Sequence, residues 1–168
     1  MDTFFEQIIA IRKNWKTMAL FTFIWLLALI ICVFFILVPI LGSFTLFIIF
    51  GVLFGAYKLS SLLNIEYEYI ITNGTLDIDK IVNKSSRKRM LSFELSTVSR
   101  IEKYNPAVIS SLNGKKVTVA CNLSDEAYLV VAEKEGSGAT YLVFSPDERL
   151  RGAMVKFMPK FIANSAFK

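Results

Sequence analysis

The sequence predicts a two-helix membrane hairpin followed by an α+β soluble domain, and three observations support this fold class. Residues 17–57 form a run of 41 residues without a single charge. After this run, apolar and polar residues alternate, and turn signals separate about seven short strands. Near the C-terminus the apolar spacing becomes helical, which predicts one helix after the strands.

The uncharged run is too long for one membrane crossing. A straight helix of this length would extend about 60 Å, roughly twice the hydrocarbon core of a bilayer. Pro39 and Gly42 lie near the middle of the run and are typical of a tight turn. We therefore expect a hairpin over 17–63, with spans at about 18–38 and 43–63. A re-entrant hairpin that does not cross the bilayer is the alternative.

The first sixteen residues read as an interfacial amphipathic helix. Thr3 and Glu6 have the spacing of a capping box. Four apolar residues fall on one helical face: Phe4, Ile8, Ile11 and Trp15. The alternative is that these residues simply extend the first span.

Basic residues flank the hairpin on one side only, which predicts its orientation. The turn between the spans has none, so the positive-inside rule places both termini in the cytoplasm. The residues expected at the membrane interface are Arg12, Lys13, Trp15, Lys16 and Lys58.

Gly51 and Gly55 form a small-xxx-small pair in the second span. Such a pair lets a helix backbone approach a neighbour closely, so we expect it to pack on the first span. A homodimer through the same glycines is the alternative.

Residues 64–168 are expected to form one soluble domain, with strands over about 65–144 and a helix over about 146–158. Asn73-Gly74 predicts a hairpin turn after the first of these strands, and the polar stretch 83–89 reads as a loop. The order Ser145-Pro146-Asp147-Glu148 predicts a capped helix start, with Ser145 as the cap. We expect the strands to curl into an antiparallel sheet or barrel that the helix covers.

This arrangement resembles bacterial pleckstrin-homology-like (PH-like) domains. The resemblance rests on Tyr69-Ile-Ile-Thr72-Asn-Gly74 at the start of the domain, and on the stretch from Leu91 to Ile101 after a basic loop. It extends over most of the chain, since small bacterial membrane proteins of this family carry such a domain after two membrane helices. It implies a seven-stranded PH-like fold at a bacterial inner or plasma membrane.

The basic stretch is the sharpest local feature of the domain. Lys84, Arg87, Lys88 and Arg89 could lie against anionic headgroups, and each cation near a membrane surface contributes about 1 kcal/mol. The alternative is a solvated loop whose charge aids solubility. The resemblance adds no headgroup specificity, because no matching residue pattern is present.

The residues offer little for catalysis or metal binding. The chain has no histidine, so Cys121 has no histidine to activate it and is expected to be a buried strand residue. Asp77 and Asp79 lack further ligands for a metal ion nearby. We therefore expect no cofactor and no metal. The net charge of +5 is also too small and dispersed for a nucleic-acid binder.

The expected function is a membrane-anchored binding or assembly module that acts on the cytoplasmic face without catalysis. We expect a protein partner, whose peptide binds at an exposed strand edge or groove by β-augmentation. The alternative is a sensor of anionic lipid headgroups that uses the basic loop. A membrane enzyme is the third and least supported reading.

Overall fold

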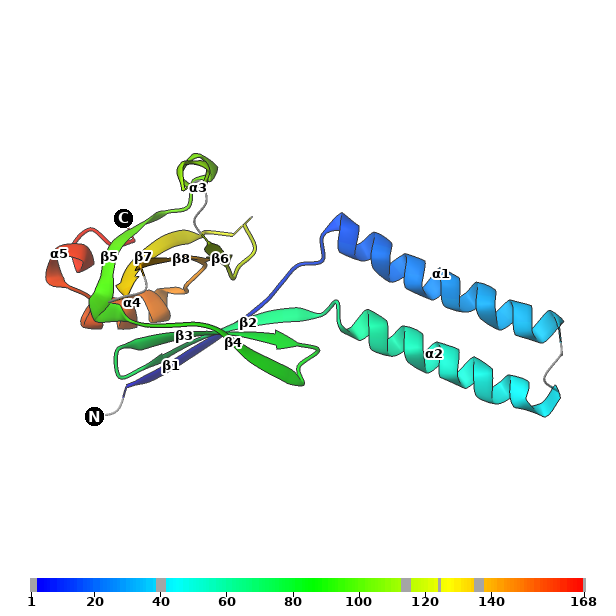
Figure 1. Cartoon of the computed structure of the whole chain (residues 1–168). Helices are drawn as coiled ribbons and strands as arrows, with labels where there is room; N and C mark the ends of the chain where they lie inside the picture. The colour runs from blue at the N-terminus through cyan, green and yellow to red at the C-terminus, as the bar shows by residue number, and fades with distance from the viewer. Residues whose placement is uncertain (1–2, 39–41, 113–115, 124, 135–137, 168) are drawn as a thin grey trace. The chain divides into compact units, whose positions relative to one another are not determined.

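The computed structural model describes residues 3–38, 42–112, 116–123, 125–134 and 138–167 (Figure 1). The chain divides into two compact units. The helical unit comprises residues 12–65 and 82–86, and the sheet unit comprises residues 1–11, 66–81 and 87–168. The basic stretch 83–89, expected to be one loop, is therefore divided between the two units.

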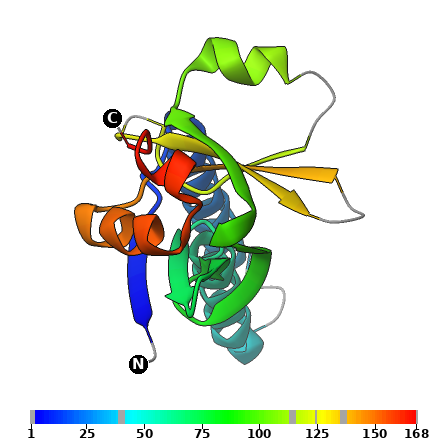
Figure 2. The ribbon, with the colours of Figure 1, turned by 90° about the vertical axis from the view of Figure 1, so that its left-hand side faces the viewer.

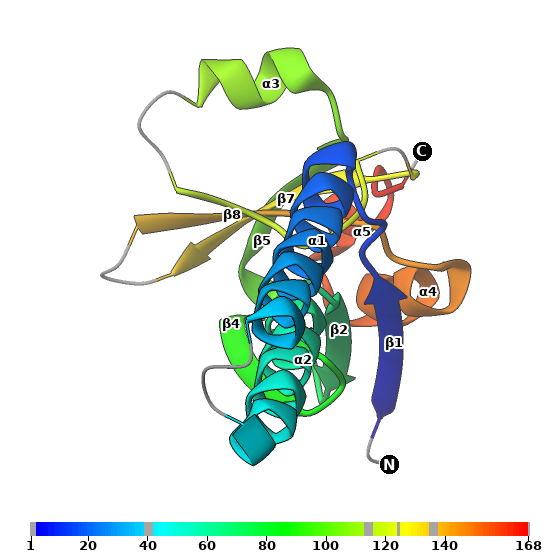
Figure 3. The same cartoon turned by 90° about the vertical axis from the view of Figure 1, so that its right-hand side faces the viewer.

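The helical unit is an antiparallel hairpin, as expected. Helix α1 (Trp15–Leu37) and helix α2 (Thr45–Ser61), which follows the 3₁₀ turn η1 (Gly42–Phe44), run side by side (Figure 3). The Asn14 side chain caps α1 by accepting from the Trp15 N–H. Gly42 has a φ of 52°, which suits a glycine in a turn. Pro39, expected in the same turn, lies outside the described residues.

The hairpin buries little of its surface. The contact between α1 and α2 buries the small residues Ala28, Cys32 and Ala56, while most of the large apolar side chains on both helices stay exposed. Both helical segments are long and apolar enough to cross a membrane, judged by length and composition. An apolar surface of this extent is what lipid would cover.

The first sheet corrects the prediction for the N-terminus. Residues 4–10 form strand β1 (Phe4–Ala10) and not an interfacial helix. The sheet has the order β1-β2-β3-β4, with β2 (Ile65–Thr72), β3 (Thr75–Val82) and β4 (Ser86–Glu94). The spacing of Phe4 and Ile8 fits one face of a strand as well as one face of a helix. Seven consecutive backbone pairs with β2 stabilise the strand.

The sheet also corrects the predicted basic loop. Only Asn83, Lys84 and Ser85 form the turn between β3 and β4, and residues 86–89 already belong to β4. Asn83 and Lys84 both have positive φ, and the Ser85 N–H donates to the Val82 carbonyl, as in a type I′ turn. Asn73 and Gly74 likewise have positive φ between β2 and β3, which confirms the predicted turn there.

The second sheet has the order β5-β7-β8-β6. Its strands are β5 (Val98–Lys103), β6 (Val117–Val119), β7 (Tyr128–Lys134) and β8 (Gly138–Phe144), with a 3₁₀ turn η2 (Leu95–Thr97) before β5 and helix α3 (Pro106–Ser111) after it. Seven described strands lie within 65–144, as expected. However, β6 pairs parallel to β8, and the strands form two open sheets with no closed barrel in the described part of the chain.

The core of the sheet unit lies between the two sheets and the C-terminal helices. Tyr69 of β2 meets Phe144 of β8 edge to face, with ring centroids 5.4 Å apart. Helix α4 (Glu148–Phe157) adds Leu150 and Met154 to this core, and α5 (Lys160–Ala163) adds Ile162. The cap of α4 is Asp147, which accepts from the Leu150 N–H at 2.7 Å. The predicted cap, Ser145, instead donates to the Glu126 carbonyl.

Candidate functional site

All of the chain's net charge belongs to the helical unit. The sheet unit contains all fourteen acidic residues and fourteen of the nineteen basic residues, so its own charge is zero. The other five basic residues belong to the helical unit: Arg12, Lys13, Lys16, Lys58 and Lys84. We call these five residues the cationic collar. They are all exposed, and they lie at the end of the hairpin opposite η1.

The turn between β3 and β4 brings Lys84 into the cationic collar. The Asn83 N–H donates to the Asn64 carbonyl at 2.8 Å, just after α2 ends. Lys84 therefore lies near the same helix end as Lys58. Sequence reasoning grouped Lys84 with 87–89 instead, because nothing in the local pattern reveals a contact with Asn64.

Three of the predicted interface lysines lie over aromatic rings. Nζ of Lys13 lies 4.9 Å from the Phe21 ring centroid, and Nζ of Lys58 lies 5.6 Å from that of Phe54. Lys16 lies over Trp15 in the same way, at 5.8 Å. A lysine at a membrane interface typically lays its aliphatic stem along apolar surface and keeps its charged end in water. Arg12 and Trp15 are exposed at the same end of the hairpin.

Two of the four predicted headgroup residues are already paired with carboxylates. Arg87 Nη2 lies 2.8 Å from Glu68 Oε1, and Arg89 contacts both Asp77 and Asp79 at 2.8 Å. Asp77 and Asp79 thus pair with an arginine, as their alternation on one strand face allows. Lys88 is exposed on β4. These pairs reduce the positive charge that the stretch 87–89 presents to a phosphate.

Glu68 is a buried acid that sequence reasoning did not single out. Its side chain is 1% exposed, and Oε2 has no hydrogen-bond partner. Burial raises the pKa of the Glu68 carboxyl, a hydrogen bond with Glu6 on β1 raises it further, and Arg87 opposes both effects. The alternation along β2 indicated which face Glu68 occupies but not that this position is buried.

The two predicted packing glycines differ in their surroundings. A Cβ added at Gly51 or at Gly55 would meet no atom within 4 Å, so neither lies at a close contact between helix backbones. Gly55 lines a cavity between α1 and α2, whereas Gly51 does not. The buried helix contact is instead made by Ala28, Cys32 and Ala56.

Neither cysteine chemistry nor a metal centre finds support in the described residues. Cys121 is a buried free thiol, and burial together with the nearby Asp125 raises its pKa to about 11. It is therefore protonated at neutral pH and a poor nucleophile. In the described ranges, no group of three or more His, Cys, Asp or Glu side chains could hold a metal ion.

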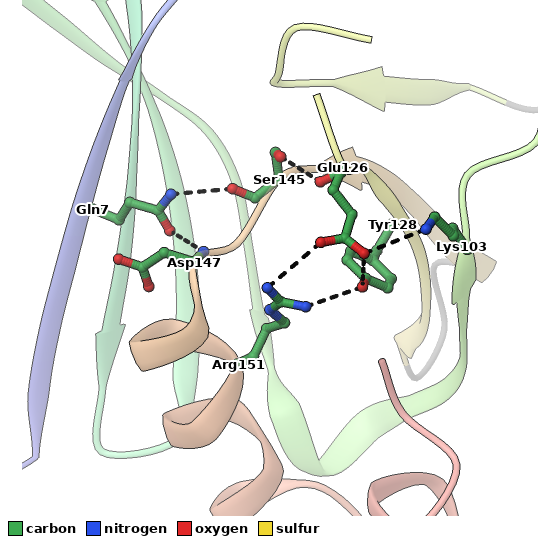
Figure 4. A network of polar contacts seen from close by, with 7 residues as sticks. All are labelled: Gln7, Lys103, Glu126, Tyr128, Ser145, Asp147 and Arg151. Atoms are coloured by element: carbon green, nitrogen blue, oxygen red, sulfur yellow. Dashed lines mark hydrogen bonds and ion pairs between the residues drawn. The ribbon is translucent and has the colours of Figure 1, made fainter. Parts of the chain in front are cut away.

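A polar network fastens β1 to the start of α4 (Figure 4). Gln7 Nε2 donates to the Ser145 carbonyl at 3.1 Å, and the Asp147 N–H donates to Gln7 Oε1 at 2.8 Å. Asn122 Nδ2 adds a bond to the Ala10 carbonyl at 3.1 Å. These three bonds hold the N-terminal strand to segments far along the chain.

The same view shows a cluster around the Glu126 carboxylate (Figure 4). Hydrogen bonds from the Tyr128 hydroxyl and from Lys103 lower the pKa of Glu126, and Arg151 lies 3.6 Å away. Arg151 also donates to the Tyr128 hydroxyl at 3.1 Å. The charges of the cluster therefore satisfy one another, as is usual for a structural network.

β1 is one of the two edge strands of its sheet in the described structure. β1 lies at one end of its sheet, and no strand flanks its outer side (Figure 2). It has seven residues, an unbroken register, and neither proline nor a basic residue. Phe4 and Ile8 on one face are 61% and 53% exposed. Sequence reasoning missed this strand, although Phe5, Gln7 and Ile9 have the period-two spacing of one strand face.

Two sheets around one core with C-terminal helices define an α+β domain, and a two-helix apolar hairpin is inserted between its first two strands. The model of the family described as Bacterial PH-like domain (DUF6106) matches residues 1–164. The chain belongs to this family, which confirms the PH-like class that the resemblance implied. No curated protein matches the chain.

Proposed function

We propose that this chain is a membrane-anchored PH-like binding module that binds a protein partner at the edge of β1, without catalysis. The anchor lies in a bacterial cell membrane, crosses it twice, and leaves both termini in the cytoplasm. One observation carries the proposal. The apolar hairpin is inserted between β1 and β2, so the strand that offers a free edge is itself joined directly to the anchor.

The cationic collar supports the anchor and its orientation. Its five positive charges lie at one end of the hairpin, while residues 37–45 at the other end carry no charge. The positive-inside rule places the charged end in the cytoplasm. Only residues 11–14 and 62–64 connect the hairpin to β1 and β2, and four residues extend at most about 14 Å. The hairpin is thus joined to β1 and β2 by two short connections.

Comparison of the sheet edges favours β1 as the partner site. Natural edge strands are protected by charge, proline, bulges, shortness or a covering helix, and α4 contacts β1 on the side of Gln7. β4 carries Arg87, Lys88 and Arg89, β5 contains a bulge between Val98 and Arg100, and β6 has three residues. β1 is seven residues long and has no bulge, and its one charged residue is Glu6.

The backbone of β1 presents hydrogen-bonding groups outward. The Asn73 N–H donates to the Thr3 carbonyl, so by alternation Phe5, Gln7 and Ile9 bond to β2. The N–H and C=O groups of Glu6 and Ile8 then point away from the sheet. An extended peptide could pair with these groups while its side chains contact Phe4 and Ile8.

Photocrosslinking in native membranes tests the proposal. A photoreactive benzoyl-phenylalanine replaces Phe4 in the full chain, and Ile8→Pro is compared with Ile8→Ala. Proline removes an outward N–H that β2 does not use, and edge strands tolerate it. We expect a protein adduct that persists in Ile8→Ala and falls at least fivefold in Ile8→Pro. An adduct of 38 kDa would identify a second copy as the partner. Equal adducts in both variants, or adducts to lipid alone, would refute the proposal.

The cationic collar also favours anionic lipid as a ligand. The predicted headgroup loop supports this candidate less well, because Arg87 and Arg89 are paired with carboxylates. Lys84 and Lys88 remain exposed. A lipid role through the hairpin itself has a separate structural basis.

A further inference from the structure

The hairpin contains an open groove between its two helices. Its volume is ≈ 250 Å³, and its lining is almost wholly apolar. The lining includes Phe23, Leu27 and Ile31 from α1 and Val52, Gly55 and Leu59 from α2. Water gains no hydrogen bonds in such a space, and apolar cavities of about 150 Å³ in proteins stay dry and bind small apolar molecules.

Gly55 helps to form this groove. It is half-buried, and a Cβ at this position would meet nothing within 4 Å. A larger side chain at this position would therefore project into unoccupied space. In a bilayer, this gap would forfeit dispersion contacts unless a slender apolar chain filled it.

The Leu59 end of the groove points toward the end of the hairpin that carries the cationic collar. Leu59 follows Lys58 directly, and the Asn83–Asn64 hydrogen bond brings Lys84 to the same end of α2. An occupant with an apolar tail and an anionic head would match both features. Two lysines from separate segments could share one phosphate, each through a charge-assisted hydrogen bond.

We propose that this groove holds one acyl chain of an anionic phospholipid whose phosphate is bound by Lys58 and Lys84. The inference rests on the membrane anchoring in the proposed function and is independent of the β1 edge. A second copy of the hairpin fits less well. A parallel copy would bring five more positive charges to the same end of the hairpin.

Native mass spectrometry of the full chain, released from nanodiscs of phosphatidylglycerol and phosphatidylcholine, tests the groove. Gly55→Leu fills it, and Gly51→Leu is the matched control because it also meets nothing within 4 Å but lies outside the lining. We expect wild type and Gly51→Leu to retain one phospholipid, and Gly55→Leu to retain at least tenfold less. Gly55→Ala, a smaller change, should give an intermediate loss if Gly55→Leu fails to fold.

The headgroup contact is tested by the pair Lys58→Gln with Lys84→Gln. The control pair removes two exposed lysines of the sheet unit, Lys116→Gln with Lys156→Gln. We expect only the first pair to abolish a preference of at least fivefold for phosphatidylglycerol, while one lipid is still retained.

Equal retention in Gly55→Leu and Gly51→Leu would overturn the inference, as would an unchanged preference in the collar pair or a dimer that Gly55→Leu abolishes. Carbonate extraction of cell membranes separates this failure from failure of the anchor. A chain that resists extraction but retains no lipid contradicts the groove alone. A chain that carbonate releases contradicts both proposals.

Discussion

At the scale of single residues, Glu68 is the most unusual group in the sheet unit. Its carboxyl is buried beside Glu6 and within reach of Asp79, and it forms an ion pair with Arg87. Burying a charge without full compensation is unfavourable, so the protonation equilibrium of Glu68 shifts toward the neutral carboxylic acid. The sheet unit should therefore be least stable at the pH values at which the Glu68 carboxyl is ionised.

The raised pKa of Glu68 gives a prediction for stability against pH. The folded state binds this proton more tightly than the unfolded state, so stability falls as pH rises from the ordinary glutamate pKa through the folded value, and stays lower above it. Glu68→Gln removes this dependence. We expect the thermal midpoint of Glu68→Gln to be higher than that of wild type at pH 7, and the difference to be smaller or absent at pH 4. Thermal unfolding measured by circular dichroism in detergent checks this prediction.

The control for Glu68 is Glu133→Gln, which changes an exposed glutamate on β7. It should leave the pH profile of the thermal midpoint unchanged. A lower midpoint for Glu68→Gln at pH 7 would show instead that the ion pair with Arg87 outweighs the burial of the charge.

At the scale of elements, β1 depends on contacts that are distant in sequence. Its ladder partner β2 begins at Ile65, and Gln7 bonds to Ser145 and Asp147 near the start of α4. A strand with so few local contacts is stabilised almost entirely by these distant partners. The bonds of Gln7 therefore bear on the same strand that we propose as the partner site.

Removal of the Gln7 side chain should loosen β1. Gln7→Ala leaves the Ser145 carbonyl and the Asp147 N–H to bond with water, at a cost of about 0.5–1.5 kcal/mol per lost hydrogen bond. We expect faster hydrogen exchange of the β1 amides and a lower free energy of unfolding. Gln7→Glu keeps an acceptor for the Asp147 N–H but cannot donate to the Ser145 carbonyl. Its free energy of unfolding should therefore lie between those of wild type and Gln7→Ala. Exchange in Gln7→Ala as slow as in wild type would contradict this role.

The elements differ in how far the sequence predicts them. The uncharged run and the alternation over 65–144 predict the hairpin and seven strands, because both signals are local. β1 was misread because Phe4 and Ile8 fit a helix face and a strand face equally, and only the distant β2 decides between them. The stretch 86–89 was misread as a loop because its cations pair with carboxylates on β2 and β3.

The candidate site residues also differ in whether a local signal or a distant contact reveals them. Arg12, Lys13, Trp15, Lys16 and Lys58 could be chosen from their places beside an apolar run. The addition of Lys84 to this group depends on a hydrogen bond between Asn83 and Asn64, nineteen positions apart in the chain. The groove at Gly55 could not be predicted, because the small-xxx-small spacing indicates contact and not empty space.

At the scale of the whole molecule, charge and hydrophobicity are divided between the two units. The sheet unit is electrically neutral, while the helical unit has five positive charges, no negative ones and most of the exposed apolar surface. This division is expected if one unit meets a membrane and the other meets a partner. The central claim is therefore that the hairpin crosses the bilayer with the cationic collar in the cytoplasm.

Cysteine labelling in intact cells tests this claim most directly. In a full chain with Cys32→Ala and Cys121→Ala, single cysteines are introduced as Ser43→Cys beside the turn and Lys84→Cys in the cationic collar. We predict that an impermeant maleimide labels Ser43→Cys in intact cells and Lys84→Cys only after permeabilisation. Labelling of Lys84→Cys in intact cells would reverse the orientation. Protection of Ser43→Cys in intact cells would contradict a hairpin that crosses the membrane.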